Sequence, residues 1–403
     1  MSLLSVDNAL RMVLDYAREP LPAEPVAIGQ AAGRTLAAPL TALRTQPPFA
    51  ASAMDGYAVR AADIAAPGAR LAVVGAAPAG HAFAGTVGPG EAVRIFTGAP
   101  VPEGADTILV QEHADADGDA VVARTAEPAG RFVRPAGLDF TAGETLLQAG
   151  HRMGPRSQAL AAAMGHAEVP VRRRPRVAVL ATGDELVRPG EAMRPDQIVA
   201  SNVYAIAGMV TEAGGVPIDL GIATDDFAAL EAAVAAAEEA GADVLVTLGG
   251  ASVGDHDLVQ SALTRRGMRL GFWRIAMRPG KPLIFGSLGR MAILGLPGNP
   301  VSSIVCAHLF LEPLLRALAG DPDAGADRSA PAVLGGPLPA NDMRQDYLRA
   351  RLSLDADGRT VATPFGRQDS SMLRLLADAQ ALVVRPPHAP PAAAGDPCRI
   401  LRF

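Results

Sequence analysis

The sequence RVAVLATG, residues 176–183, decides the fold, because it is an apolar run rich in strand-forming residues that ends in a turn. Three similar runs follow it: VPIDLGIA at 216–223, DVLVTLGG at 243–250 and RMAILGLPG at 290–298. Helix-forming stretches separate the four runs. This alternation predicts a parallel β-sheet covered by helices on both faces. In such a sheet, ligands bind at the carboxyl ends of the strands.

Four regions differ in composition along the 403 residues. We expect a discontinuous helical linker domain at 1–44 and 140–174, with a β-rich domain inserted at 45–139. The α/β domain spans 175–326, and a Gly/Pro/Asp-rich segment leads from it into a C-terminal β domain at 327–403. The predicted fold class is therefore α/β and β, in several domains.

The net charge, the length of the apolar runs and the cysteine content argue against several classes of protein. A net charge of −6 argues against nucleic acid as a partner. No uninterrupted apolar run reaches the roughly 18–20 residues of a membrane span. The N-terminus is expected to be an amphipathic helix capped by Ser5, because Asp7 and Asp15 do not fit a signal peptide. The two cysteines, Cys306 and Cys398, lack metal-ligand spacing. We expect a cytoplasmic protein without membrane or nucleic-acid partners.

Acidic residues follow three of the predicted strands. Glu185, Asp225 and Asp257 each share the turn after a strand with a second acid. One such acid is ordinarily a helix cap, and Asp226 is expected to cap the helix that begins at Phe227. Three acidic turns on one edge of a sheet instead favour a hard cation such as Mg²⁺.

Two glycine-rich turns, LGGASVGDHD at 248–257 and GLPGNPVSS at 295–303, flank the segment RPGKP. That segment carries Lys281, the single lysine among 36 basic residues, and a compact ammonium is not interchangeable with a guanidinium. Pro300 is expected at the first position of a helix, whose free N–H donors then face outward. Either turn alone would be an ordinary connection between a strand and a helix. Together with Arg274 and Arg278 they predict an anion site, and neither a Walker A nor a G-x-G-x-x-G motif is present.

Taken together, the segments resemble the molybdopterin molybdenumtransferase family (MoeA and the E domain of gephyrin). The matching strings occur in family order and span nearly the whole chain. They are PPFAASAMDGYAVR, IFTGAPVPEGADTILVQE, RPAGLDFTAGETLL, VAVLATGDELV, SNVYAIAGMV, GGASVGDHD, RPGKP and GLPGNPVSS.

The resemblance implies an α/β domain similar in fold to molybdopterin adenylyltransferases. It also implies an elongated homodimer, with the active cleft between the α/β domain of one subunit and the β-rich and C-terminal parts of the other. The implied reaction inserts molybdate into adenylylated molybdopterin with Mg²⁺ and loss of AMP. Transient contacts with molybdopterin adenylyltransferase and with downstream molybdenum cofactor proteins are implied as well.

The residue patterns and the resemblance together nominate a site. Asp55 and Asp139, which by themselves indicate only turns, enter it through the resemblance alone. The expected catalytic residues are Asp55, Asp139, Glu185, Asp225, Asp257 and Lys281, of which Glu185, Asp225 and Asp257 are the expected metal ligands. The expected substrate-binding residues are Thr97, Gly249, Gly250, Ser252, Gly254, Arg274, Arg278, Pro297, Gly298, Asn299, Pro300, Arg344, Arg349 and Ser370.

The chain departs from the family pattern at two places. Arg274 and Arg278 stand where the family often has lysine, and Asp369 stands where it usually has glycine before Ser370. Two other functions stay open: the adenylyltransferase reaction and a gephyrin-like scaffold. The AMDGY region and the C-terminal domain favour the insertion enzyme. The lack of a fused adenylyltransferase domain and of a long disordered linker disfavours the scaffold.

Overall fold

The first predicted strand forms β13 (Arg176–Thr182), in which every residue after Arg176 is buried. The structure is a computed structural model that describes residues 3–250 and 258–403. β13 lies in a six-stranded sheet of order β16-β13-β17-β21-β20-β18. The other strands are β16 (Val216–Ala223), β17 (Val244–Leu248), β18 (Arg269–Trp273), β20 (Ile284–Leu288) and β21 (Met291–Leu296).

The sheet is parallel where the sequence predicted it and antiparallel at one edge. β13 pairs in parallel with β16 and β17, and β17 pairs in parallel with β21. β20 and β18 add antiparallel strands that the strand pattern did not predict. Only residues 289–290 separate β20 from β21, and so short a turn joins antiparallel strands, whereas parallel ones need a long crossover.

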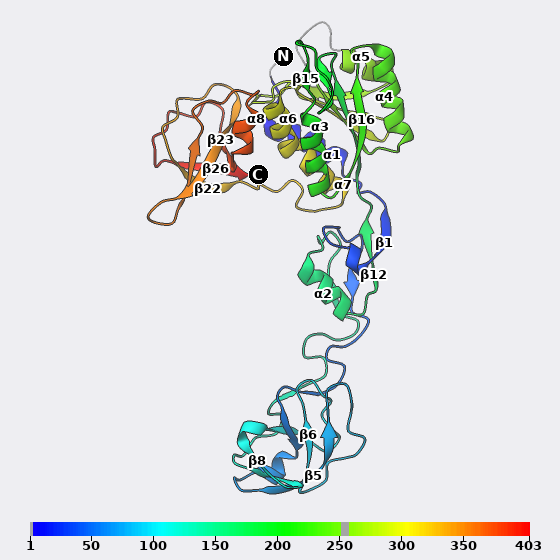
Figure 1. Ribbon diagram of the computed structural model, residues 1–403, viewed down its shortest axis with the longest axis vertical. Coiled ribbons are helices and arrows are strands. Elements are labelled where there is room, and N and C mark those ends of the chain that lie inside the picture. The colour runs from blue at the N-terminus through cyan, green and yellow to red at the C-terminus, as the bar shows by residue number, and fades with distance from the viewer. Residues whose placement is uncertain (1–2, 251–257) are drawn as a thin grey trace.

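Helices cover both faces of the sheet, as expected (Figure 1). Val177 and Val179 of β13 pack into one cluster, whereas Ala178 and Leu180 pack into the other, because side chains alternate along a strand. The first cluster holds α1 (Val6–Tyr16), α3 (Asn202–Glu212), α6 (Pro300–Cys306) and α7 (Glu312–Leu318); the second holds α4 (Phe227–Glu239) and α5 (Leu258–Arg265).

Three predicted helix starts are confirmed. The Ser5 hydroxyl accepts a hydrogen bond from the Asn8 N–H at the start of α1. The Asp226 carboxylate accepts one from the Ala229 N–H at 2.8 Å, and Pro300 is the first residue of α6. The first N–H groups of a helix have no partner inside it. Ser5 and Asp226 accept hydrogen bonds from such groups, and Pro300 has no N–H to satisfy.

Helix α1 does not belong with the linker domain, where the predicted boundary of 1–44 placed it. Its buried residues Val6, Ala9 and Val13 join the core of the α/β domain. α1 lies against α7, far along the sequence. Composition could not show this, because an amphipathic helix does not specify which domain buries its apolar face.

One helical stretch is long and apolar enough to cross a membrane by length and composition. It runs over Pro300–Leu318 and includes a π-helical turn at Ala307–Leu311. In the structure 78% of it is buried inside the protein. This helical stretch is therefore buried like a core helix. Glu312 and Arg316 interrupt its apolar sequence, which is why the sequence contains no unbroken apolar run here.

The linker and the β-rich domain extend away from the α/β domain along the long axis of the molecule (Figure 1). The linker contains α2 (Pro155–Ala163) and two small antiparallel pairs, whereas the β-rich domain has a six-stranded sheet of order β7-β4-β6-β5-β9-β8. In the linker, β1 (Ala23–Ala27) pairs with β12 (Glu168–Arg172), and β2 (Leu40–Thr41) pairs with β11 (Thr145–Leu147). A third pair, β3 (Ala51–Ser52) with β10 (Val133–Arg134), leads into the β-rich domain. The strands of its sheet are β4 (Gly56–Val59), β5 (Arg70–Ala77), β6 (Glu91–Ile95), β7 (Thr107–Val110), β8 (Ala114–Asp117) and β9 (Ala120–Ala123).

The C-terminal domain is a β-barrel. Its strands follow one another as β23-β24-β22-β26-β25, and β25 pairs back to β23 to close the ring. β19 (Met277–Arg278), which comes from the RPGKP region, adds in parallel to β23 and joins the two domains. The barrel strands are β22 (Ala330–Leu334), β23 (Gln345–Leu354), β24 (Thr360–Pro364), β25 (Ala381–Arg385) and β26 (Pro397–Arg402), with α8 (Leu373–Ala377) before β25.

Candidate functional site

A cavity of about 740 Å³ lies at the carboxyl ends of β13, β17 and β21. It is the kind of place where open α/β sheets bind ligands. Loops after all three strands line it, together with the start of α3 and a residue of the C-terminal domain. Among the lining residues are Thr182, Gly183, Glu185, Asn202, Asp225, Gly249, Gly250, Pro282, Pro297, Gly298, Asn299, Pro300 and Ser371.

The turn after β17 needs its glycines. Gly249 and Gly250 have φ of +105° and +64°, in the region that side chains disfavour. A Cβ on Gly249 would lie 2.8 Å from the Thr182 carbonyl oxygen, and one on Gly250 would lie 2.2 Å from Val259. The backbone therefore closes tightly against its neighbours and presents its surface to the cavity. Ser252 and Gly254, nominated in the same turn, lie outside the described residues.

The turn after β21 is held by internal hydrogen bonds. The Ser303 hydroxyl donates to the Pro297 carbonyl oxygen, and the Asn202 amide donates to the Gly298 carbonyl oxygen at 2.7 Å. Ser303 is buried, so its hydroxyl shapes the loop rather than meeting a ligand. Pro297, Gly298, Asn299 and Pro300 all border the cavity.

Two of the three expected metal ligands line this cavity together. Glu185 follows β13 and Asp225 follows β16, and the Asp225 N–H donates to the Asp184 carboxylate at 3.2 Å. Burial raises the pKa of Asp225, and the negative charges of Asp184 and Glu185 raise it further. Asp257 lies outside the described residues. Within the described ranges, no group of three or more His, Cys, Asp or Glu side chains is placed to hold a metal ion.

The three nominated cations of the basic segment have different surroundings. Pro282, next to Lys281, lines the cavity, and the exposed Lys281 side chain has no hydrogen-bond or ion-pair partner in the described parts of the chain. Arg278 pairs with Asp346 and, at 3.6 Å, with Asp342. Lys281 is therefore free to meet an anion, whereas the charge of Arg278 is already balanced.

Arg274 has a strained backbone, with φ at +69°. Its guanidinium lies 3.8 Å from the ring centroid of Trp273, a cation–π contact. The Arg274 Nε and the Trp273 Nε1 are both buried without a hydrogen-bond partner among the described residues. Strain and unpaired donors are features that cluster at functional sites.

The C-terminal domain reaches the cavity within the same chain. The Asn299 amide donates to the Ser370 hydroxyl at 3.0 Å, and the Val301 N–H donates to the Ser370 carbonyl oxygen at 3.1 Å. Ser371 lines the cavity. Within one chain this segment therefore contacts its own α/β domain, and the pairing of β19 with β23 joins the same two domains. The contact across a dimer that the resemblance implies stays a prediction.

The other nominated residues of this domain support that segment. Arg349 is 1% exposed and donates to Gln368 and to the Met372 carbonyl oxygen, leaving its Nη2 without a partner among the described residues. Arg344 is paired with Asp342 at 2.6 Å. The Asp369 carboxylate accepts hydrogen bonds from the N–H and hydroxyl of Ser371, which lower the Asp369 pKa. Asp369 thus serves as a turn residue.

Three nominated residues lie elsewhere, in the β-rich part of the chain. The N–H and hydroxyl of Thr97 both donate to the Asp55 carboxylate at 2.7 Å and lower the Asp55 pKa. Asp139 lines a separate hollow of about 430 Å³ with Arg134 and Gly98. The linker separates this region from the α/β domain (Figure 1). The structure therefore divides the nominated residues into two groups.

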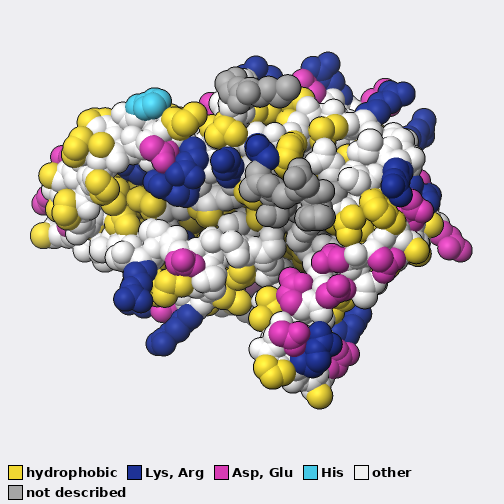
Figure 2. All heavy atoms as spheres, turned by 90° about the horizontal axis from the view of Figure 1, so that it is seen from above, with side chains coloured by type: hydrophobic (Ala, Val, Ile, Leu, Met, Phe, Trp, Pro, Cys, Tyr) yellow, Lys and Arg dark blue, Asp and Glu magenta, His cyan; other side chains and the backbone are white. Residues whose placement is uncertain are grey.

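The sequence analysis missed Asn202 and Ser371 as cavity residues. Asn202 begins α3 within SNVYAIAGMV, a string already matched to the family, so that match was the available signal. Ser371 directly follows Ser370 and carried no signal of its own. Figure 2 shows this end of the molecule from above, with both acidic and basic side chains on the surface.

Family models match three successive parts of the chain. They are the MoeA N-terminal region (domain I and II) over residues 4–165, a probable molybdopterin binding domain over 178–317 and the MoeA C-terminal region (domain IV) over 331–403.

Relatives match over the full length. The chain is 37% identical over 400 residues to "Molybdopterin molybdenumtransferase 2" of Mycobacterium tuberculosis, covering 97% of both chains. It is 32% identical over 402 residues to "Molybdopterin molybdenumtransferase" of Haemophilus influenzae, covering 100% of this chain and 99% of the relative.

A solved structure agrees with these matches. The molybdopterin biosynthesis moeA protein of Pyrococcus horikoshii superposes with a TM-score of 0.84 at 31% identity, covering 100% of this chain and 99% of that one. The chain therefore belongs to the molybdopterin molybdenumtransferase family.

Proposed function

We propose that this protein inserts molybdate into adenylylated molybdopterin in a Mg²⁺-dependent reaction that releases AMP. The observation that carries the proposal is a single cavity that combines two glycine-rich loops, the carboxylates Glu185 and Asp225, and the neighbourhood of Lys281. The substrate has a phosphate and a pterin, and the second substrate is a doubly charged tetrahedral oxyanion. Each of these groups has a chemically suitable partner in the cavity.

The glycine turns suit the nucleotide and the pterin. Gly249 and Gly250 have no side chain to block the approach of a phosphate to their backbone. The turn from Pro297 to Pro300 borders the same cavity at the start of α6, so its backbone lies where the pterin or the phosphate would bind. Lys281, with its unpaired ammonium, attracts molybdate and keeps it near the pterin.

The acidic pair suits a hard cation. Mg²⁺ prefers carboxylate oxygens and water, and Glu185 and Asp225 would hold it, with Asp257 as the third ligand expected from the sequence. Burial raises the pKa of Asp225, and the negative charges of Asp184 and Glu185 raise it further; a divalent cation would offset this crowding of charge. When bound, the cation neutralises charge that develops on the phosphate during release of AMP.

The division of the nominated residues supports a homodimer. Asp55, Thr97 and Asp139 lie in the β-rich region, and the linker separates them from the cavity of their own chain (Figure 1). A second copy related by twofold symmetry could bring its β-rich region to that cavity. The enzyme would work in the cytoplasm, receiving its substrate from molybdopterin adenylyltransferase and passing its product to proteins that use the cofactor.

The proposed reaction predicts AMP release that depends on both molybdate and Mg²⁺. Purified protein is incubated with adenylyl-molybdopterin and AMP is measured by chromatography. Glu185→Gln or Asp225→Asn should lower the rate by at least roughly 100-fold, because loss of even an outer-shell metal partner costs 10–100-fold. In a separate incubation with molybdopterin and MgATP, ATP consumption with pyrophosphate release would indicate the adenylyltransferase reaction. A protein active in neither incubation would point to a scaffold.

Lysine and arginine should not be interchangeable at Lys281. Lys281→Arg is expected to lower kcat/KM by about tenfold or more, a loss of about 1.4 kcal/mol in transition-state stabilisation. Arg278→Lys retains the charge that faces Asp346 and should affect thermal stability more than kcat/KM. Equal kcat/KM for the two variants would show that the site does not require a compact ammonium.

A shared site predicts complementation between inactive variants. Asp55→Ala and Asp225→Ala proteins are unfolded together, refolded as a mixture and assayed. Roughly a quarter of wild-type activity should return, because half of the randomly formed dimers are mixed and each of these has one intact site. Each variant refolded alone is the control. A mixture that stays inactive would show that Asp55 acts on its own chain or not at all.

A further inference from the structure

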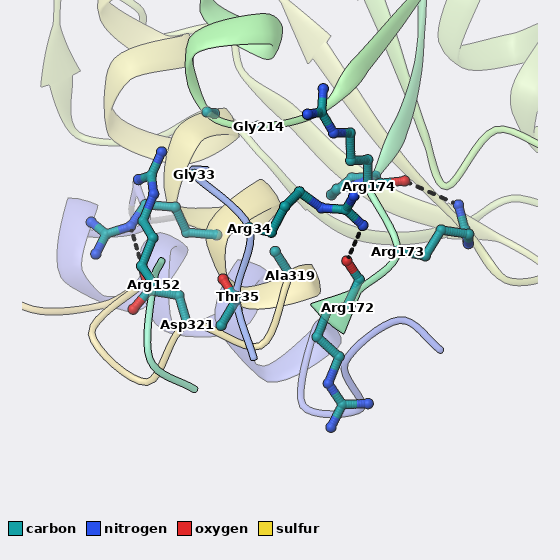
Figure 3. A pocket seen from close by; sticks show the side chains of 13 residues that line it. Gly33, Arg34, Thr35, Arg152, Arg172, Arg173, Arg174, Gly214, Ala319 and Asp321 are labelled. Carbon is teal, nitrogen blue, oxygen red and sulfur yellow. Dashed lines mark hydrogen bonds and ion pairs between the residues drawn. The ribbon is translucent and has the colours of Figure 1, made fainter. Parts of the chain in front are cut away.

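A second cavity lies at the opposite end of the α/β sheet, where the linker domain joins it (Figure 3). Pro175 precedes β13 and Gly214 precedes β16, so this cavity borders the amino ends of the strands, whereas the candidate active site borders their carboxyl ends. Six arginines line it, drawn from both domains: Arg34, Arg152, Arg172, Arg173, Arg174 and Arg316.

Carboxylates balance only half of this charge. Arg34 pairs with Glu24 at 2.5 Å, Arg173 pairs with Asp243 at 2.7 Å, and Arg316 pairs with Asp321 at 2.7 Å. The side chains of Arg152, Arg172 and Arg174 have no carboxylate partner among residues 3–250 and 258–403. The Arg172 guanidinium points away from the other arginines, toward the Leu21 carbonyl oxygen (Figure 3). Arg152 and Arg174 are therefore the two positive charges at the opening without a carboxylate partner, in a chain whose net charge is −6.

Helix capping explains only part of this excess. α3 and α7 both end at the cavity, and arginines commonly hydrogen-bond the free carbonyls of helix ends. Arg152 approaches the Glu212 carbonyl oxygen at the end of α3 at 3.5 Å, a marginal contact. Arg172 donates at 3.1 Å to the Leu21 carbonyl oxygen, which lies outside any helix. Within the described chain Arg174 makes no side-chain hydrogen bond or ion pair. Like charges crowded without an anion are unfavourable.

We propose that this junction binds a tetrahedral dianion of the phosphate, sulfate or molybdate class. Arg152 and Arg174 are exposed, and Arg34 lies between them in the view of Figure 3. The enclosed volume of about 10 Å³ suits one water molecule, so the oxyanion binds at the mouth, where guanidinium groups close on it with charge-assisted hydrogen bonds.

The bound anion would tie two domains together. Arg152 belongs to the linker, beside its isolated bridge to Thr35, whereas Arg174 directly precedes the first strand of the α/β sheet. An anion held by both residues restrains the angle between the domains. That angle sets where the β-rich region stands, so anion binding here regulates the geometry of the whole molecule.

Equilibrium dialysis against labelled phosphate tests the proposal, at constant ionic strength in chloride buffer. Four full-length proteins are compared: wild type, Lys281→Gln, the double variant Arg152→Gln/Arg174→Gln, and the matched control Arg11→Gln/Arg402→Gln, which removes two exposed arginines elsewhere. Lys281→Gln removes the cation of the candidate active site. Its comparison with the junction variant therefore separates the two anion sites.

We expect the junction variant to lose one equivalent of phosphate, or to bind it at least tenfold more weakly, while Lys281→Gln and the control retain that equivalent. Sulfate and molybdate should compete for it. Unchanged binding by the junction variant, or failure of both anions to compete, would overturn the proposal. Circular dichroism in chloride checks folding. Should the double variant not fold, Arg174→Gln is measured instead, because its exposed side chain supports no other residue.

Discussion

The whole site depends on one constraint, the shared direction of β13, β16, β17 and β21. Parallel strands release their chains at the same edge of a sheet, so the turns that follow them must lie close together. The carboxylates Glu185 and Asp225, the glycines after β17 and the proline-bounded turn after β21 come together for this reason. The apolar composition of the strands thus fixes where charged chemistry takes place.

A second constraint is the short strand β19. It leaves the α/β domain next to Lys281 and pairs with β23 of the C-terminal barrel. The ion pairs of Arg278 with Asp342 and Asp346 lie at the same junction. This arrangement brings Ser370 and Ser371 to the cavity of their own chain and lets the buried Arg349 support the turn that carries them. The basic segment is therefore both a structural connection and the source of one free cation.

Local patterns predicted local features well. The strand at 176–183, the caps Ser5 and Asp226, and Pro300 at the start of a helix depend on short-range chemistry that a few neighbouring residues contain. The strand alternation also predicted the edge at which the turns of Glu185 and Asp225 meet. Resemblance to the family was needed for Asp55 and Asp139, because a single acid in a turn carries no further signal.

Long-range features could not be predicted in this way. Arg278 and Asp346 are 68 residues apart in sequence, and nothing near either residue indicates that they pair. The burial of α1 in the α/β core has the same origin, because an apolar helix face accepts any apolar partner. The excess of arginines at the linker junction arises from segments that meet only in the folded chain.

The most direct test of the central claim is Mn²⁺ binding, measured by electron paramagnetic resonance in the presence of AMP. If the edge of the parallel sheet holds a cation, wild-type protein should bind one Mn²⁺ per subunit, and Glu185→Gln/Asp225→Asn should bind it at least about tenfold more weakly. Equal Mn²⁺ affinity in the two proteins would contradict a cation site at this edge and the mechanism built on it.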